Sequence, residues 1–77
     1  MNVRLPELGE GIAKATVACW HFKIGDRIKQ GDDLVEVATD KAIFNVASKE
    51  DGIVKEILVQ EGEDIAVGET LAIVDKH

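Results

Sequence analysis

Short runs of apolar residues alternate with polar ones along the chain, and none repeats with the 3.6-residue period of a helix. The runs are rich in Val, Ile, Thr and aromatic residues, which is the composition of β-strands. Glycines and acidic residues separate them, as in turns. The pattern predicts an all-β fold with about eight short strands, at residues 2–5, 16–22, around 28, 34–39, 43–47, 53–59, around 65, and 70–74.

The sequence also matches itself without gaps at an offset of 37 residues. The matched pairs are Val17/Val54, Gly25/Gly62, Asp26/Glu63, Ile28/Ile65, Gly31/Gly68, Asp32/Glu69, Leu34/Leu71 and Val37/Val74. A repeat this short cannot bury its own apolar face, so we expect two halves packed about a pseudo-twofold axis. Two four-stranded antiparallel sheets, face to face, fit this pattern. The repeated glycines are expected in turns that need positive φ.

The repeat assigns side chains to the two faces of each strand. Positions that are apolar in both halves should point inward, namely Trp20 with Ile57 and Phe22 with Val59. Val17 and Val54 are also apolar, but each lies an odd number of residues from these positions, so strict alternation cannot bury both sets. We therefore predict a β-bulge or a strong twist near Ala18 and near Lys55. Trp20 is interpreted as a core residue.

A polar interruption near the middle of the chain, Thr39–Ala42, separates two predicted strands. Two strands joined by so short a polar segment predict a hairpin with Lys41 at its exposed tip. A lysine at such a tip is usually only a solvated charge. Because the equivalent segment of the second half is residues 75–77, the hairpin is expected at one end of the domain and the termini at the other.

Size and charge exclude several classes of function. A chain of 77 residues forms one small domain with a thin core, so a ligand site is expected on the surface. The net charge of −6 and the absence of basic clusters argue against binding to nucleic acid or anionic membranes. No apolar stretch approaches the roughly 18 residues of a membrane span. Without a signal or transit peptide, a natural start at Met1 predicts the cytoplasm, and a trimmed eukaryotic chain the mitochondrial matrix.

Cys19 is the single cysteine, so no disulfide and no Cys-x-x-Cys metal or redox pair is expected. His21 lies two residues away, on the same face of a predicted strand. A catalytic Cys–His pair would also need an acidic residue placed by the fold. Ordinary strand residues are the default interpretation, and we expect neither a catalytic residue nor a metal site.

Several segments together resemble a known family. They are Pro6–Ile12, Val17–Trp20, Gly25–Asp26, Thr39–Ala42 with its Asp-Lys-Ala motif, Asp51–Gly52 and Glu61–Gly62. Over essentially its whole length the chain resembles the lipoyl domain of the acyltransferase subunit of 2-oxo-acid dehydrogenase complexes. The resemblance implies a flattened eight-stranded barrel or sandwich with quasi-twofold symmetry. Residues 1–77 are then one carrier domain, expected to be the N-terminal part of a longer acyltransferase chain.

The resemblance implies that Lys41 carries lipoic acid in amide linkage, attached by a lipoylating enzyme. The domain is then a swinging-arm carrier and not an enzyme by itself, and the isolated domain is expected to be monomeric. Its implied partners are a thiamine-diphosphate-dependent 2-oxo-acid decarboxylase, the acyltransferase catalytic domain and dihydrolipoyl dehydrogenase. These three would in turn acylate the lipoyl group, pass the acyl group to coenzyme A and reoxidise the dithiol.

Partner recognition is implied for residues around Lys41. Asp40 and Ala42 flank it, although simple turn chemistry accounts for both equally well. In the family, the loop after the first strand lies near the lipoyl turn and helps the decarboxylase to choose its carrier. Here that loop is residues 8–13, with Gly9, Glu10 and Gly11. Its opening at residues 8–12 looks more like the pyruvate or branched-chain group than the 2-oxoglutarate group, but the 2-oxo acid stays open.

Three alternatives remain. A biotin carrier domain shares the fold but usually has methionines on both sides of its lysine, where this chain has Asp40 and Ala42. An unmodified binding module of the same fold would leave Lys41 without a chemical role. An enzyme with Lys41 as a Schiff-base nucleophile would need a desolvated lysine, which a hairpin tip does not offer.

Overall fold

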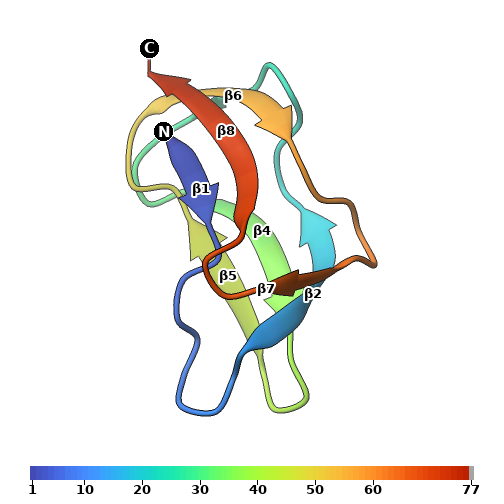
Figure 1. The fold of residues 1–77 in the computed structure, drawn as a ribbon. Coiled ribbons are helices and arrows are strands. Elements are labelled where there is room, and N and C mark those ends of the chain that lie inside the picture. The colour runs from blue at the N-terminus through green and yellow to red at the C-terminus, as the bar shows by residue number, and fades with distance from the viewer. Residues whose placement is uncertain (77) are drawn as a thin grey trace.

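A computed structural model describes residues 1–76 of the chain and contains eight strands. They are β1 (Asn2–Arg4), β2 (Lys14–Trp20), β3 (Arg27–Ile28), β4 (Asp33–Ala38), β5 (Ile43–Ala47), β6 (Gly52–Ile57), β7 (Asp64–Ala66) and β8 (Thr70–Lys76). Two four-stranded antiparallel sheets form, with strand orders β1-β8-β6-β3 and β5-β4-β2-β7 (Figure 1). The all-β prediction is confirmed, with strand ends shifted by up to two residues. Within residues 1–76 there is no helix with the length and apolar character to cross a bilayer.

The two halves of the chain exchange their shortest strands. Strands β2, β3 and β4 of the first half correspond to β6, β7 and β8 of the second. However, β3 pairs with β6, and β7 pairs with β2, so each of these short strands joins the sheet built on the long strands of the other half. This exchange joins the halves into one unit and gives the predicted pseudo-twofold arrangement.

Both predicted β-bulges are present at equivalent positions. The pairing of β2 with β4 shifts register between Val17 and Cys19, and that of β6 with β8 shifts between Val54 and Glu56. The extra residue at each bulge changes the face to which the following side chains point. Val17 and Val54 are therefore both buried. The apolar residues three positions later, Trp20 and Ile57, also pack against the core.

The core lies between the two sheets and consists of aliphatic side chains. The largest fully buried ones are Leu5, Val17, Leu34, Val35, Val37, Ile65, Leu71 and Val74. The interpretation of Trp20 as a core residue needs correction, because Trp20, Phe22 and Ile57 are only partly buried and pack against the edge of the core. The indole N–H of Trp20 donates a hydrogen bond to the Val59 carbonyl at 2.9 Å. An indole packs its body on apolar groups while keeping its N–H bonded, and this suits the rim of the sandwich.

The repeated acidic and glycine positions are turn positions. Each repeated carboxylate accepts a hydrogen bond from the backbone N–H three residues before it: Asp26 from Lys23, Asp32 from Lys29, Glu63 from Gln60 and Glu69 from Ala66. The four repeated glycines all have positive φ, as predicted. The repeat in the sequence thus encodes both the turns and the core.

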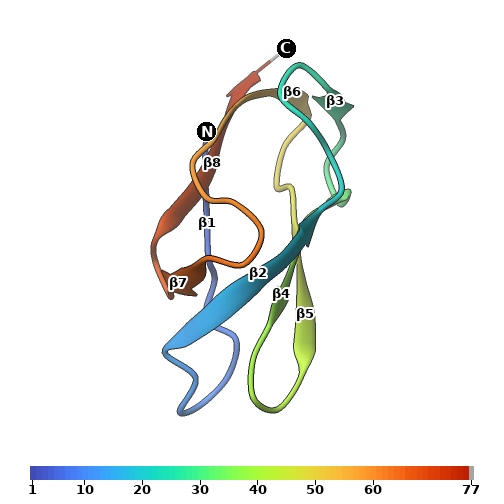
Figure 2. The ribbon, with the colours of Figure 1, turned by 90° about the vertical axis from the view of Figure 1, so that its right-hand side faces the viewer.

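The hairpin turn between β4 and β5 lies at one end of the molecule, beside the loop that joins β1 to β2 (Figures 1 and 2). The N-terminus and the end of β8 lie at the opposite end. The domain is elongated, with a longest dimension of 36 Å. The expected opposition of hairpin and termini is therefore present, although the equivalent segment 75–77 includes His77, which lies outside the described residues.

Candidate functional site

The hairpin forms as predicted and holds Lys41 at an exposed position of its turn. Strands β4 and β5 stay paired up to Ala38 and Ile43. Beyond this pair, the N–H of Thr39 donates to the carbonyl of Ala42 at 2.8 Å. The turn is therefore closed by backbone hydrogen bonding immediately below the lysine.

The side chain of Thr39 fixes the backbone on both sides of the lysine. Its Oγ1 accepts hydrogen bonds from the N–H of Lys41 at 3.2 Å and of Ala42 at 3.1 Å, and donates to the Ala42 carbonyl at 3.0 Å. Such hydroxyl-centred turns are a known use of Ser and Thr. The sequence pattern did not indicate this role of Thr39, although a threonine two residues before the candidate lysine was the available signal.

Lys41 offers a free primary amine to solvent. Its side chain makes no hydrogen bond or ion pair with any other residue in the described range 1–76, where the ion pair found joins Lys55 and Asp75. The exposed position lacks the burial that activates a Schiff-base lysine. It suits instead a lysine that another enzyme must reach.

Two shallow hollows lie beside the turn, and Asp40 lines both. Gly11–Lys14 and Thr39–Lys41 line the first hollow, of about 240 Å³. The loop between β1 and β2 therefore lies next to the lysine turn, as expected from the resemblance.

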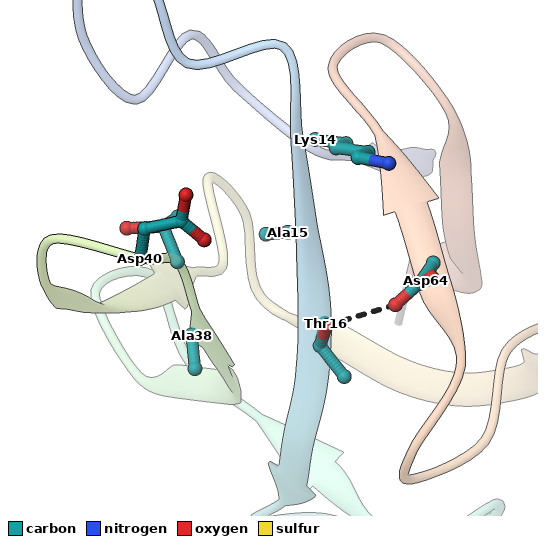
Figure 3. Close-up of a pocket in the computed structure, with 7 residues that line it drawn as sticks. Lys14, Ala15, Thr16, Ala38, Asp40 and Asp64 are labelled. Carbon is teal, nitrogen blue, oxygen red and sulfur yellow. Dashed lines mark hydrogen bonds between the residues drawn. The ribbon is translucent and has the colours of Figure 1, made fainter.

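The second hollow, of about 250 Å³, lies between the turn, β2 and β7 (Figure 3). On its far side the hydroxyl of Thr16 donates to Asp64 Oδ1 at 2.8 Å. In Figure 3, Asp40 and Asp64 lie on either side of β2, which carries Thr16. Asp40 thus lines both hollows next to the lysine, together with Lys14 and Thr39.

The expected recognition residues are only partly gathered around Lys41. Asp40 and Gly11 line a hollow beside it, whereas Gly9, Glu10 and Ala42 are exposed and line neither hollow. Gly9 and Gly11 have φ of +149° and +79°. Backbone geometry therefore explains both glycines, whatever partner the loop meets.

A second cluster lies on the outer face of the same sheet. Cys19 and His21 are joined there by Glu36, and one donor atom of each lies within 4.8 Å of the other two. Partial burial and the carboxylates of Glu36 and Glu61 raise the pKa of the Cys19 thiol. A raised pKa keeps the thiol protonated at neutral pH, so it is not an activated nucleophile. Sequence reasoning missed Glu36, whose place opposite Cys19 depends on strand register.

Comparisons with known proteins agree with this architecture. Residues 1–74 match a biotinyl/lipoyl family model described as "Biotin-requiring enzyme". The chain is 40% identical over 73 residues to the dihydrolipoyllysine-residue succinyltransferase component of the 2-oxoglutarate dehydrogenase complex from Staphylococcus saprophyticus. It is also 40% identical over 76 residues to the acetyltransferase component of the pyruvate dehydrogenase complex from Acholeplasma laidlawii. These matches cover 95% and 99% of this chain, but only 17% and 14% of the two relatives.

Among solved structures, the lipoyl domain of the 2-oxoglutarate dehydrogenase complex from Azotobacter vinelandii is similar, with a TM-score of 0.79 and 34% identity. The match covers 99% of this chain and 96% of that one, so it extends over the whole domain. Lipoyl domains are carrier modules of acyltransferases and not catalytic domains themselves. The chain therefore belongs to the biotinyl/lipoyl attachment-domain family and, within it, to the lipoyl domains of the acyltransferase components of 2-oxo-acid dehydrogenase complexes.

Proposed function

We propose that Lys41 is the residue to which lipoic acid is attached in amide linkage, and that the domain is a swinging-arm carrier. The observation that carries this proposal is the geometry of Asp40–Ala42. The lysine is exposed at the turn of a paired hairpin, and its amine is free of contacts within residues 1–76. An exposed amine with open surroundings fits a long acyl chain, whereas a buried one would not.

The protein's own contribution is to position the lysine. The Thr39 hydroxyl holds the backbone N–H of Lys41 and of Ala42, so the attachment point keeps one orientation. Amide formation removes the lysine charge and takes the formal net charge from −6 to −7. When bound, the lipoyl dithiolane supplies the redox and acyl-carrying chemistry, and the protein supplies position and recognition.

The proposed partners are the other components of such a complex. A thiamine-diphosphate-dependent decarboxylase would load the arm, an acyltransferase domain would unload it, and dihydrolipoyl dehydrogenase would reoxidise it. If the domain is tethered to the acyltransferase, high local concentration replaces free diffusion between these active sites. Among the expected recognition residues, Asp40 and Gly11 line a hollow together with Lys41. We therefore propose that these two contact the partner enzymes.

The 2-oxo acid stays open. The chain is 40% identical both to a relative from a 2-oxoglutarate complex and to one from a pyruvate complex, so overall identity does not separate these groups. The likeness of residues 8–12 to the pyruvate or branched-chain group stays a prediction.

Intact-mass measurement after incubation with lipoate ligase, ATP and lipoate tests the attachment site. We expect one lipoyl increment on the 77-residue chain. It should vanish in Lys41→Arg, which keeps the positive charge, and persist in Lys49→Arg, which alters another exposed lysine. A parallel reaction with biotin ligase and biotin is expected to give no increment.

An unmodified folded chain would overturn the carrier proposal and favour a binding module of the same fold. An increment retained in Lys41→Arg would place the attachment elsewhere. A biotinyl increment without a lipoyl one would favour the biotin carrier, whose domains belong to the same family.

A further inference from the structure

Three chemically different donors meet on the outer face of the sheet formed by β5, β4, β2 and β7. Cys19 on β2 is paired with Glu36 on β4. His21 follows two residues after Cys19, and its backbone N–H donates to the Leu34 carbonyl at 2.9 Å, so pairing continues past the end of β2. The backbone register itself therefore places the three side chains next to one another. One sulfur, one imidazole nitrogen and one carboxylate oxygen lie within 4.8 Å of each other.

These donors are not committed to other contacts. None of the three side chains forms a hydrogen bond or an ion pair with another residue of the described range 1–76. Cys19 and Glu36 are partly buried, while His21 is exposed, so the cluster is open on one side. Glu61 adds a second carboxylate that acts on Cys19. The surroundings are thus negative and favour a cation.

The fold does not require this set of residues. At the repeat offset, the equivalent positions in the other sheet are Glu56, Leu58 and Ile73. Glu56 is paired with Ile73 just as Cys19 is paired with Glu36. Equivalent backbone positions thus carry one possible metal ligand in the sheet of β6 and β8, and three in the sheet of β2 and β4. The fold therefore forms without this set of three ligands.

We propose that Cys19, His21 and Glu36 form a binding site for a zinc-type divalent cation, with water in the fourth position. Sulfur, imidazole and carboxylate are the ligands of Zn²⁺, whereas Mg²⁺ and Ca²⁺ take oxygen ligands. Metal–ligand bonds of roughly 2.0–2.3 Å place tetrahedral ligands about 3.3–3.8 Å apart. The donors now lie within 4.8 Å of one another, so binding of one ion requires an approach of up to about 1 Å, which we expect from rotation of the side chains.

This site is independent of the carrier function. It lies toward the end of β4 that is away from the turn, since His21 is opposite Leu34 and Lys41 follows Ala38. It revises the expectation of no metal site, which rested on the lone cysteine. Metal binding at these three residues does not depend on lipoylation of Lys41.

Cobalt titration of the reduced 77-residue chain tests the site. Lys41 is kept unmodified, because the dithiol of a lipoyl group would itself bind soft metals. We expect one Co²⁺ per chain, with thiolate-to-cobalt charge-transfer absorption and the strong visible bands of a tetrahedral site. Added Zn²⁺ should displace the cobalt and raise the melting temperature, because it binds the native state.

Four variants distinguish binding at this site from nonspecific attraction of cations to the negatively charged domain. Cys19→Ser should remove the charge-transfer band, and His21→Ala and Glu36→Gln should each weaken binding at least about tenfold, since loss even of an outer-sphere partner costs about 10–100-fold. Glu56→Gln removes the same charge at the equivalent position of the other sheet and should leave the affinity unchanged.

Absence of the band in the parent chain, or its persistence in Cys19→Ser, would overturn the proposal. Equal weakening by Glu36→Gln and Glu56→Gln would also overturn it, since that result indicates net charge alone. Circular dichroism checks that each variant is folded. His21→Ala and Glu36→Gln alter side chains on the outer face, so they remain informative if Cys19→Ser does not fold.

Discussion

The two halves of the molecule have the same backbone arrangement, but they differ in the side chains outside the core. Each has a long bulged strand paired with a second strand, and the register shift falls at the same place in both. After that pair, the first half continues into the Lys41 turn, whereas β8 leads to the C-terminal end of the domain. Residues repeated between the halves build the fold, while residues without a counterpart carry the candidate chemistry.

Truncation of equivalent core leucines should have the largest effect. Leu34 is 1% exposed and Leu71 is 0% exposed, at matching positions of β4 and β8. Leu34→Ala and Leu71→Ala should each lower the free energy of unfolding by about 2–5 kcal/mol, through lost burial and the cavity left behind. Urea unfolding measures both. A large loss for one and almost none for the other would contradict the equivalence of the halves.

The pair Ala15 and Gly52 should show where the equivalence fails. Gly52 is buried, and a methyl group built on it would overlap the Asp75 carbonyl oxygen and lie 2.6 Å from Val74 Cγ1. Gly52→Ala should therefore destabilise the domain by about 1–3 kcal/mol through overpacking. The reverse change at the matching site, Ala15→Gly, should cost about 0.5–1 kcal/mol. Thermal unfolding of the two variants compares them, and a harmless Gly52→Ala would show that the strands can separate locally.

Loss of the Thr39 hydroxyl should affect the turn and spare the core. Thr39→Ala leaves the N–H groups of Lys41 and Ala42 without their side-chain acceptor and should cost about 1 kcal/mol. It should also slow ligase-catalysed lipoylation, because the attachment point is less ordered. Thr39→Ser keeps the hydroxyl and is the matched control. Equal lipoylation rates for all three proteins, measured by mass against time, would show that the hydroxyl does not position the lysine.

The smallest effect concerns the reactivity of Cys19. Its pKa is raised by partial burial and by the carboxylates of Glu36 and Glu61. The thiolate fraction at a given pH is therefore lower than in an unhindered thiol, and alkylation at pH 7–8 should be slow. Glu36→Gln removes one charge and should speed alkylation, while Glu56→Gln should not. Iodoacetamide kinetics across pH test this, and a rate unaffected by Glu36→Gln would contradict the electrostatic cause.

The same raised pKa sets the sign of a stability effect. In the alkaline range the unfolded chain releases the thiol proton at lower pH than the native chain does. The native state then binds more protons, so stability falls as pH rises through the ordinary thiol range. Cys19→Ser should lose this component of the pH dependence.

The structural roles of residues with a repeated counterpart were predictable from the sequence, because two copies of the pattern have to fit the same arrangement of strands and turns. The bulges followed from the phase of Val17 and Val54, and the hairpin from the break at Thr39–Ala42. The exchange of β3 and β7 was not predicted, because strands of two and three residues carry too little pattern to identify their partners. Trp20 was placed too deep, since periodicity indicates a face but not distance from the rim.

The candidate site was predictable only as far as the motif around Lys41. The hollow between the Lys41 turn and the first loop depends on how two loops pack, which strand patterning does not encode. The cluster of Cys19 with Glu36 likewise depends on register between strands. Chemistry that arises from contacts across the sheet was therefore found only in the structure.

The elongated shape gives the domain a mechanical consequence. The β4–β5 turn, which carries Lys41, lies at the opposite end of a body 36 Å long from the N-terminus and the end of β8, so a tether joined at that opposite end would act as a pivot far from the lysine. A modest rotation about that pivot moves the lysine through a wide arc, while the hairpin keeps its orientation relative to the body. If Lys41 carries the proposed lipoyl group, the length of the β-sandwich would add to the reach of that group.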